Sequence, residues 1–296
     1  MKSGILNLYK PCGPTSHDMI YRMRRLLGIK KIGHTGTLDP MAEGVLPICI
    51  GKGTKASGML TDSDKAYRAT MVLGMTTDTQ DADGTVLTEC RVDVSDAQLE
   101  ETIARFTGEI EQIPPMYSAV KLNGKKLYEL ARRGEEIERP ARKVRIDEIR
   151  LVERDGDLIT LDVYCSKGTY IRTLCADMGD ALGCGAYVNR LIRIKSGPFL
   201  LENAYTEETL SRMVQEGRGE DAITSLNEVY GDYPVRTVSG KELFLVQNGV
   251  PLPARKETEG ERIRICDTDG TLLGISQREG DKLRMKIAFH GGGDGE

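Results

Sequence analysis

Tryptophan is absent from this 296-residue sequence, and aromatic residues make up only 5% of it. Long apolar runs are absent too: the VLPICI segment at 45–50 is far shorter than the roughly 20 residues that a membrane-spanning helix needs. Residues 1–11 lack the apolar stretch of a secretory signal. With 39% hydrophobic and 29% charged residues, the composition is typical of a globular protein, for which we expect a cytoplasmic location without membrane contact.

Patterns typical of metal sites and disulfides are also missing. Three histidines occur, no CxxC pair is present, and the seven cysteines are scattered along the chain. Neither a zinc site nor a disulfide framework fits this spacing, so we expect no metal and mostly buried free thiols. The cysteines are Cys12, Cys49, Cys90, Cys165, Cys175, Cys184 and Cys266.

Nucleotide and calcium motifs are present only in part. Gly51-x-Gly53-x-x-Ala56 follows an apolar strand pattern, as a dinucleotide fingerprint does, but the regular β-α-β alternation around it is missing. Six residues separate Gly44 from Gly51, too many for a phosphate-binding P-loop. The acidic stretch around Asp81 lacks the first and last ligands of a calcium loop.

The net charge is −4, but the charge is unevenly distributed. Residues 1–31 carry seven Lys or Arg against one acid, and residues 115–150 carry ten against six. Residues 75–111 carry ten acids against two arginines. Two basic segments on an acidic chain indicate a local anion-binding face, although solvated helix faces explain the pattern equally well.

Strand and helix patterns interleave irregularly along the chain. Apolar runs predict strands at 5–9, 45–50, 67–73, 143–153 and 158–165. Capping and periodicity predict helices beginning at Ser16 and Ser95, and others over 126–133 and 170–182. This order is typical of an α+β fold with a large mixed or antiparallel sheet.

A change in composition near 217–234 indicates a domain boundary. Beyond it we expect a helix at 239–248 and a hairpin with Asp269-Gly270 at its turn. We therefore divide the chain into a large domain at 1–231, a small β-rich domain at 232–290 and a disordered tail at 291–296.

The segment at 33–44, GHTGTLDPMAEG, is an unusually constrained loop. Pro40 disfavours helical geometry at Asp39, and the flanking glycines permit sharp turns and close backbone approach. A carboxylate held on a rigid loop, with His34 nearby in sequence, is a candidate for catalysis. Asp-Pro is also a common turn dipeptide, so the pattern by itself leaves a purely structural role open.

The longer segment GHTGTLDPMAEGVLPICIGKGTK at 33–55 resembles the catalytic motif of the bacterial tRNA pseudouridine-55 synthases, the TruB family. The resemblance continues through 65–84, 113–134 and 165–191 and spans nearly all of residues 4–199. It implies a pseudouridine synthase catalytic domain followed by a PUA-like domain. Tyr9, Tyr187 and Ile192 depart from the residues common in the family.

The resemblance implies a cofactor-free isomerisation of uridine-55 in the T-loop of tRNA. The extruded uracil is detached at N1, turned, and rejoined to the ribose through C5. Asp39 matches the essential aspartate, which either adds to uracil C6 or acts at C1′ of the ribose. Arg172 matches the arginine that pairs with it, and Tyr67 the tyrosine that stacks on the base and is a candidate for removing the C5 proton.

Further residues match positions that bind the substrate in this family. His34 corresponds to a histidine inserted beneath the extruded nucleotide, and Asp81 to an aspartate that contacts the RNA around it. Leu191 matches an apolar contact to the uracil, and Tyr170 supports the pocket. Lys10 is a candidate for a phosphate contact.

The basic segment at 115–150 corresponds to an insertion that closes over the T-arm of tRNA in this family. Its candidates for RNA-backbone contacts are Lys121, Lys125, Lys126, Arg132 and Arg133. The partner implied is therefore tRNA, bound by a monomer without an obligate protein partner.

Two other classes of function remain as alternatives. A non-catalytic tRNA-binding or RNA-folding factor would use the same scaffold, but binding an anionic ligand does not require the carboxylate of Asp39. An enzyme that depends on a nucleotide held at 51–56 would bind NAD or ATP, which we do not expect.

Overall fold

The computed structural model describes residues 2–118, 120–122, 124–131 and 133–290. The strands are β1 (Gly4–Lys10), β2 (Ile32–His34), β3 (Glu43–Ile50), β4 (Lys65–Leu73), β5 (Met75–Thr77), β6 (Val86–Glu89), β7 (Gly108–Gln112), β8 (Lys121–Leu122), β9 (Lys125–Lys126), β10 (Arg142–Asp155), β11 (Leu158–Cys165), β12 (Ala186–Ser196), β13 (Phe199–Leu200), β14 (Ile223–Thr224), β15 (Val235–Thr237), β16 (Leu252–Pro253), β17 (Arg262–Cys266), β18 (Leu272–Glu279) and β19 (Lys282–Ala288). The α-helices are α1 (Ser16–Leu27), α2 (Ser57–Thr61), α3 (Asp96–Arg105), α4 (Leu127–Ala131), α5 (Ile171–Ala181), α6 (Glu207–Gln215), α7 (Leu226–Val229) and α8 (Gly240–Gln247), and the 3₁₀ helices are η1 (Gly51–Ala56), η2 (Leu201–Asn203) and η3 (Gly219–Ala222).

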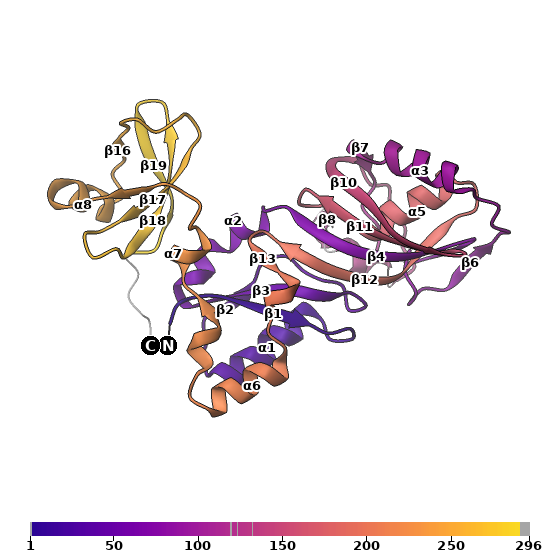
Figure 1. The fold of residues 1–296 in the computed structure, drawn as a ribbon, viewed down its shortest axis with the longest axis horizontal. Coiled ribbons are helices and arrows are strands. Elements are labelled where there is room, and N and C mark those ends of the chain that lie inside the picture. The colour runs from indigo at the N-terminus through magenta and orange to yellow at the C-terminus, as the bar shows by residue number, and fades with distance from the viewer. Residues whose placement is uncertain (1, 119, 123, 132, 291–296) are drawn as a thin grey trace.

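A ten-stranded sheet forms the body of the molecule (Figure 1). Its main path is β14-β1-β3-β12-β4-β11-β10-β7, with β2 paired to β3 and β13 paired to β12. Strand β12 runs parallel to β3 and antiparallel to β4, so it joins the two halves of the sheet. The predicted α+β fold with a large mixed sheet is confirmed.

The central strands are buried on both faces. On β3, Leu46 and Ile48 pack into one hydrophobic cluster, while Val45 and Cys49 pack into the other. Side chains alternate between the two faces of a strand, so a strand covered on both sides is apolar at every position. This explains the uninterrupted VLPICI run and confirms the buried strand predicted there.

Helices α1, α3, α5 and α6 contribute apolar side chains to the larger of these clusters. Helix α1 begins with a capping box, in which Thr15 and Asp18 bond reciprocally, and it ends at Gly28 with φ of 66°. Helix α3 begins with the capping box predicted at Ser95 and Gln98. Local capping chemistry thus sets the starts of both helices where the sequence predicted them.

A second sheet, of five strands in the order β15-β17-β18-β19-β16, is built by residues from Val235 onward. It lies at the left in Figure 1. Ile275 and Phe289 of this part pack with Ile5 and Leu60 of the first sheet's region, so the two sheets share a hydrophobic cluster. The boundary predicted near 232 falls between α7 and β15, and the predicted turn at Asp269-Gly270 joins β17 to β18.

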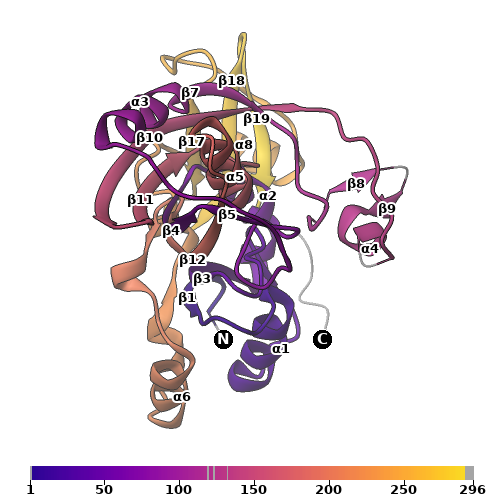
Figure 2. The same cartoon turned by 90° about the vertical axis from the view of Figure 1, so that its right-hand side faces the viewer.

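A small insertion of β8, β9 and α4 projects beside the main sheet (Figure 2). On α4 the side chains of Leu127 and Leu130 are buried. The helix is shorter than the one predicted over 126–133. The tail predicted at 291–296 lies outside the described residues. In the described ranges, no helix combines the length and hydropathy that crossing a membrane requires.

Candidate active site

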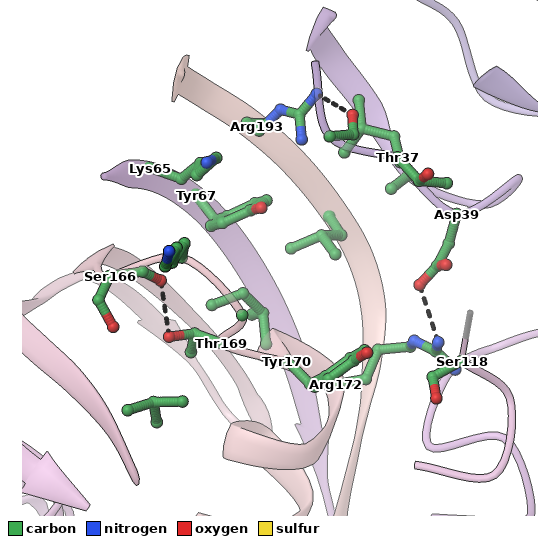
Figure 3. A pocket seen from close by; sticks show the side chains of 18 of the residues that line it. Thr37, Asp39, Lys65, Tyr67, Ser118, Ser166, Thr169, Tyr170, Arg172 and Arg193 are labelled. Carbon is green, nitrogen blue, oxygen red and sulfur yellow. Dashed lines mark hydrogen bonds and ion pairs between the residues drawn. The ribbon is translucent and has the colours of Figure 1, made fainter. Parts of the chain in front are cut away.

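An open pocket of about 600 Å³ lies where β12 runs beside β4 (Figure 3). Its lining comes from the loop at 36–42, the first residues of β4 and β10, the loop at 166–170, the start of α5, and β12. Asp39, Tyr67, Tyr170, Arg172 and Leu191, all predicted from the sequence, line it. Segments far apart in the chain therefore bring the predicted catalytic residues together.

The loop that carries Asp39 is pinned on both sides. At one side, Ser16 Oγ accepts a hydrogen bond from Leu38 N at 2.8 Å and donates one to Leu38 O at 3.0 Å. At the other side, Gly44 has φ of +105°, and a Cβ there would lie 2.3 Å from the carbonyl oxygen of Arg193. Glycine is required at this close approach, which fixes the loop against β12.

Lys10 also holds this loop, which corrects its predicted role as a phosphate contact. The side chain is fully buried, and Nζ donates to the carbonyl oxygens of Pro11, Pro40 and Ala42 at 3.0, 3.1 and 2.6 Å. Burial lowers the pKa of Lys10 to about 8. A lysine committed to three carbonyl oxygens beneath the surface positions the neighbours of Asp39 and does not reach RNA phosphate.

Asp39 forms an ion pair with Arg172, with 2.8 Å between Oδ2 and Nη2 (Figure 3). The arginine side chain is 4% exposed, whereas the aspartate side chain is 39% exposed. The cation therefore lies in the protein and the carboxylate faces the pocket. Ion-pair hydrogen bonds of this length are among the stronger ones, so the pair holds the carboxylate in one place.

Arg172 is itself held by three further acceptors. Nη1 lies 3.2 Å from Oδ2 of Asp81 and donates to Thr79 O at 2.7 Å. Nη2 donates to Tyr117 O at 2.8 Å, at the root of the insertion. Because Tyr117 and Asp39 share one guanidinium nitrogen, Arg172 connects the base of the insertion to the catalytic candidate.

The position of Asp81 differs from the RNA contact predicted for it. Its side chain is buried, pairs with Arg172 and accepts hydrogen bonds from Thr79 Oγ1 and from Asp83 N. Burial raises the pKa of Asp81, while the Thr79 hydroxyl and the Arg172 charge oppose that rise. Asp81 thus holds the second nitrogen of Arg172 from within the protein.

Tyr67 and Leu191 lie on adjacent strands and present their side chains to the same pocket. In the β4–β12 pairing Tyr67 lies opposite Arg193, and Leu191 lies opposite Ala69. Residues two apart on a strand share a face, which brings Tyr67, Leu191 and Arg193 together. Burial raises the pKa of Tyr67, while the charge of Arg193 lowers it.

Tyr170 precedes α5 and lines the pocket beside Arg172. Its backbone is fixed on both sides by Gln112, whose Oε1 accepts from Tyr170 N at 2.8 Å and whose Nε2 donates to Tyr170 O at 3.0 Å. Burial raises the pKa of its phenol. The side chain therefore lines the pocket from a fixed backbone position, and its role in supporting the pocket stays a prediction.

His34 lies at the end of β2, paired with Ile48, and is not among the residues that line the pocket. It is partly buried, and its Nδ1 has no hydrogen-bond partner among the described residues. Burial and the charges of Arg193 and His17 lower its pKa, which favours the neutral ring. The histidine thus ends β2 two residues before Gly36, which is part of the pocket lining.

Exposed basic residues surround the mouth of the pocket. Arg142, Lys143 and Lys167 line it, and Lys167 pairs with Asp62 at 2.8 Å. Of the predicted RNA-backbone candidates, Arg133 is exposed just beyond α4. Arg132 lies outside the described residues, as do the side chains of Lys121, Lys125 and Lys126.

Two buried cations in the pocket, Arg193 and Lys65, carry no motif that marks them in the sequence. Arg193 is 1% exposed, and Lys65 donates from Nζ to the carbonyl oxygens of Thr61 and Ser63. Burial lowers the pKa of Lys65 to about 8. Arg193 lies two residues from Leu191 on β12, and Lys65 lies two residues from Tyr67 on β4. Residues two apart on a strand face the same side, so this spacing is the signal that would have identified both cations.

The arrangement supports chemistry by one carboxylate. Asp39 can act as a nucleophile or stabilise a developing cation, and Tyr67 offers a phenol close to an apolar contact surface at Leu191. Within the described residues, no group of three His, Cys, Asp or Glu side chains is arranged to hold a metal ion.

Two family models match this chain in succession. The model described as "TruB family pseudouridylate synthase (N terminal domain)" matches residues 24–171. The model described as "tRNA pseudouridylate synthase B C-terminal domain" matches residues 172–229. The second match begins inside α5, so the border between the models is not a structural boundary.

Curated relatives and solved structures agree with these matches. A protein of Alkaliphilus oremlandii named tRNA pseudouridine synthase B is 49% identical to this chain, and the match covers 80% of this chain and 77% of the relative. A protein of the same name in Pseudomonas paraeruginosa is 45% identical, and the match covers 93% of this chain and 91% of the relative. A chain of a Cbf5-Nop10-Gar1 complex matches 97% of this chain and 84% of its own length, with a TM-score of 0.76 and 27% identity. A chain of an H/ACA RNP bound to a substrate RNA containing 2′-deoxyuridine matches 97% of this chain and 85% of its own length, with a TM-score of 0.74 and 25% identity. The resemblance first drawn from the motifs is thereby confirmed, and the chain belongs to the TruB family of pseudouridylate synthases.

Proposed function

We propose that this pseudouridine synthase converts uridine-55 in the T-loop of tRNA to pseudouridine, with Asp39 as its essential catalytic residue. The observation that carries the proposal is the ion pair of Asp39 with the buried Arg172, which turns the carboxylate into the pocket. The names of the relatives support tRNA as the substrate. The protein acts as a monomer on the T-arm, without an obligate protein partner.

The pocket suits one flat, uncharged base. The extruded uracil stacks on the ring of Tyr67 and contacts Leu191 on the neighbouring strand. Taking a base out of its stack costs a few kcal/mol, and aromatic stacking of about 1–3 kcal/mol per base offsets much of that cost. Tyr170 closes the side of the pocket beside Arg172.

The reaction is an isomerisation in which every atom is retained. The N1–C1′ bond breaks, the uracil turns, and a C5–C1′ bond forms. C5 then loses its hydrogen as a proton, and N1 gains one. The phenol of Tyr67 is the proposed route for the C5 proton, because its ring and hydroxyl lie where the base stacks.

Two roles for Asp39 are consistent with its position. In one, a carboxylate oxygen attacks C1′ or stabilises the positive charge that develops there as N1 leaves. In the other, the oxygen adds to uracil C6 and leaves again after the base has turned. Both require a carboxylate oxygen held in the pocket, and the ion pair with Arg172 holds it there.

The tRNA backbone contacts the basic residues around the pocket. Arg142, Lys143 and Lys167 lie at its mouth, where the phosphates next to an extruded nucleotide would pass. The insertion around α4, with Arg133 and the basic residues that precede it, closes over the T-arm. His34, a neutral ring beside the catalytic loop, fills the gap left by the base.

Mapping pseudouridine in a tRNA transcript tests the proposal. The purified protein is incubated with unmodified transcript without added cofactor, and carbodiimide adducts are mapped by primer extension. We expect a new stop that reports position 55, no stop with Asp39→Asn, and no stop in a transcript that carries cytidine at that position.

A stop at another uridine would retain the reaction and reject the position. Tight tRNA binding without any stop would contradict the proposal and favour an RNA-binding factor. Full activity of Asp39→Asn would reject the catalytic assignment.

A further inference from the structure

Arg193 is the largest fully buried side chain that lines the pocket, with 1% of its surface exposed. Its Nε donates to Val45 O at 2.7 Å, and its Nη2 donates to Gly36 O at 3.2 Å. These two bonds fasten the guanidinium to β3 and to the loop that carries Asp39. In Figure 3 it lies toward Thr37, at the far side of the pocket from Arg172.

The charge of Arg193 is not balanced by an acid. Arg172 and Arg190 each pair with a carboxylate, whereas no carboxylate in the described part of the chain pairs with Arg193. Burying a cation without a counter-charge is costly, and two carbonyl oxygens compensate only part of that cost. A guanidinium has five N–H donors, so the bonds to Val45 and Gly36 leave donors for a ligand.

The neighbours of Arg193 show which part of a nucleotide it would meet. It lies opposite Tyr67 in the β4–β12 pairing and two residues from Leu191 on the same face of β12. These are the two side chains that the uracil is proposed to contact. The cation therefore stands at the site of the base, while the exposed Arg142, Lys143 and Lys167 stand at the mouth.

We propose that Arg193 is a catalytic residue that stabilises the negative charge on the uracil when the N1–C1′ bond breaks. This inference rests on the proposed isomerisation, in the form in which Asp39 acts at C1′. The electron pair of that bond leaves with N1 and is delocalised onto the carbonyl oxygens of the ring, and the matching positive charge at C1′ falls to Asp39. A guanidinium N–H directed at one carbonyl oxygen stabilises the charge where it develops. The charge disappears from the ring as C5 bonds to C1′, after which the C5 proton is removed and N1 takes up a proton.

Burial argues against a phosphate as the partner of Arg193. Phosphates of a bound RNA remain near the surface, and they are served by basic residues that are exposed. A cation beside Tyr67 and Leu191 instead meets a group that enters the pocket completely. The lack of a carboxylate partner among the described residues fits the same role, since an internal counter-ion would cancel the charge offered to the base.

The first test compares Arg193→Gln and Arg193→Lys with the unaltered protein in single-turnover reactions on tRNA transcript. Removing one donor to a developing oxyanion costs about 10²–10³-fold in rate, so we expect a loss of this size for Arg193→Gln. Arg193→Lys keeps the positive charge and should lose less. The Kd for tRNA should stay within about threefold in both variants, because the contribution is to the transition state.

The second test replaces the target uridine with 5-fluorouridine. Fluorine withdraws electrons and stabilises the uracil anion itself, so the reaction depends less on Arg193. Cleavage of the N-glycosidic bond is followed as loss of 5-fluorouridine from the digested RNA, since fluorine at C5 blocks only the final proton removal. Arg193→Gln should slow the cleavage of both substrates. We expect the factor by which it slows cleavage of 5-fluorouridine to be at least about tenfold smaller than the factor for uridine.

A purely structural role would slow both substrates by the same factor, and that result would overturn the inference. So would an unchanged rate, or a loss confined to tRNA affinity and its salt dependence, which would indicate a phosphate contact. Thermal unfolding and tRNA affinity establish that each variant is folded. If Arg193→Gln does not fold, the comparison of the two substrates is made with Arg193→Lys. An inactive unaltered protein would instead reject the proposed function, so the two failures are distinguishable.

Discussion

Single residues of this site often do something other than what their type suggests in the sequence. Lys10 and Asp81 are polar residues in motifs, and both were predicted to meet RNA. In the structure Lys10 holds the loop around Asp39, and Asp81 holds Arg172. Sequence patterns identify which residues gather at a site, but the fold decides whether a polar side chain lines the pocket, as Arg193 does and Lys10 and Asp81 do not.

Tyr67→Phe separates the stacking of this residue from its chemistry. Phenylalanine keeps the ring that is proposed to stack on the base and removes only the hydroxyl. If the phenol carries the C5 proton, the rate of pseudouridine formation should fall by about 10² or more, with little change in tRNA affinity. Tyr164→Phe, on the neighbouring β11 and outside the pocket, is the control. A rate for Tyr67→Phe close to that of the unaltered protein would leave stacking as its only role.

How much of the site follows from the sequence depends on the kind of signal. Asp39, Tyr67, Tyr170, Arg172 and Leu191 were found through motifs and do line one pocket. Arg193 was missed because no motif marks it, and its importance follows from burial without an acidic partner among the described residues. Such a feature depends on strand pairing between residues far apart in sequence, which one-dimensional patterns do not contain.

At the scale of elements, local chemistry was the best guide. The starts of α1 and α3 follow from capping boxes, and β3 follows from its apolar run. The order of the strands in the sheet was not predicted, because it is set by long-range packing. The parallel pairing of β12 with β3 places Arg193 beside Gly44, at the end of the loop that carries Asp39, and no local sequence signal predicts this pairing.

Helix α5, which carries Arg172, contains an electrostatic weak point at Asp177. Burial and then the neighbouring Asp180 raise the pKa of Asp177 from 3.8 to about 6. Between these values the folded chain keeps a proton that the unfolded chain has lost. The free energy of unfolding therefore falls as the pH rises through this window.

Asp177→Asn should remove this penalty. The variant should be more stable than the unaltered protein by about 1–3 kcal/mol above pH 6, and the difference should vanish below about pH 4. Urea unfolding across this pH range measures it. Asp180→Asn removes only the repulsion by Asp180, the smaller cause of the raised pKa, and should raise the free energy of unfolding by less. A difference that does not depend on pH would show that Asp177 does not carry the effect.

At the scale of the whole molecule, the net charge of −4 conceals a basic site on an acidic protein. The pocket mouth and the insertion are basic, while residues 75–111 hold ten of the acids. Composition alone therefore argues weakly against an RNA partner, and the distribution of charge argues for one.

The second sheet is joined to the first through shared apolar packing, which links the two parts mechanically.

Removing positive charge from the insertion should weaken tRNA binding and flatten its salt dependence. In the variant, Lys125, Lys126, Arg132 and Arg133 are replaced by glutamine. The slope of log Kd against log salt should fall by about 0.7–0.9 for each phosphate that the variant no longer neutralises, because fewer counterions are released. The control replaces four exposed arginines away from the insertion: Arg91, Arg105, Arg212 and Arg218. Equal slopes for the two variants would remove the insertion from the interface.

The most direct test of catalysis by Asp39 is tritium release from tRNA labelled at C5 of uridine, since the reaction exchanges the C5 hydrogen for the bond to C1′. Asp39→Asn is compared with Asp62→Asn, which removes another carboxylate from the lining of the same pocket. We predict no release above background for Asp39→Asn, with tRNA affinity within about tenfold, and release within about tenfold of the unaltered protein for Asp62→Asn. Release by Asp39→Asn at a rate close to that of the unaltered protein would contradict the central claim that Asp39 is the catalytic carboxylate.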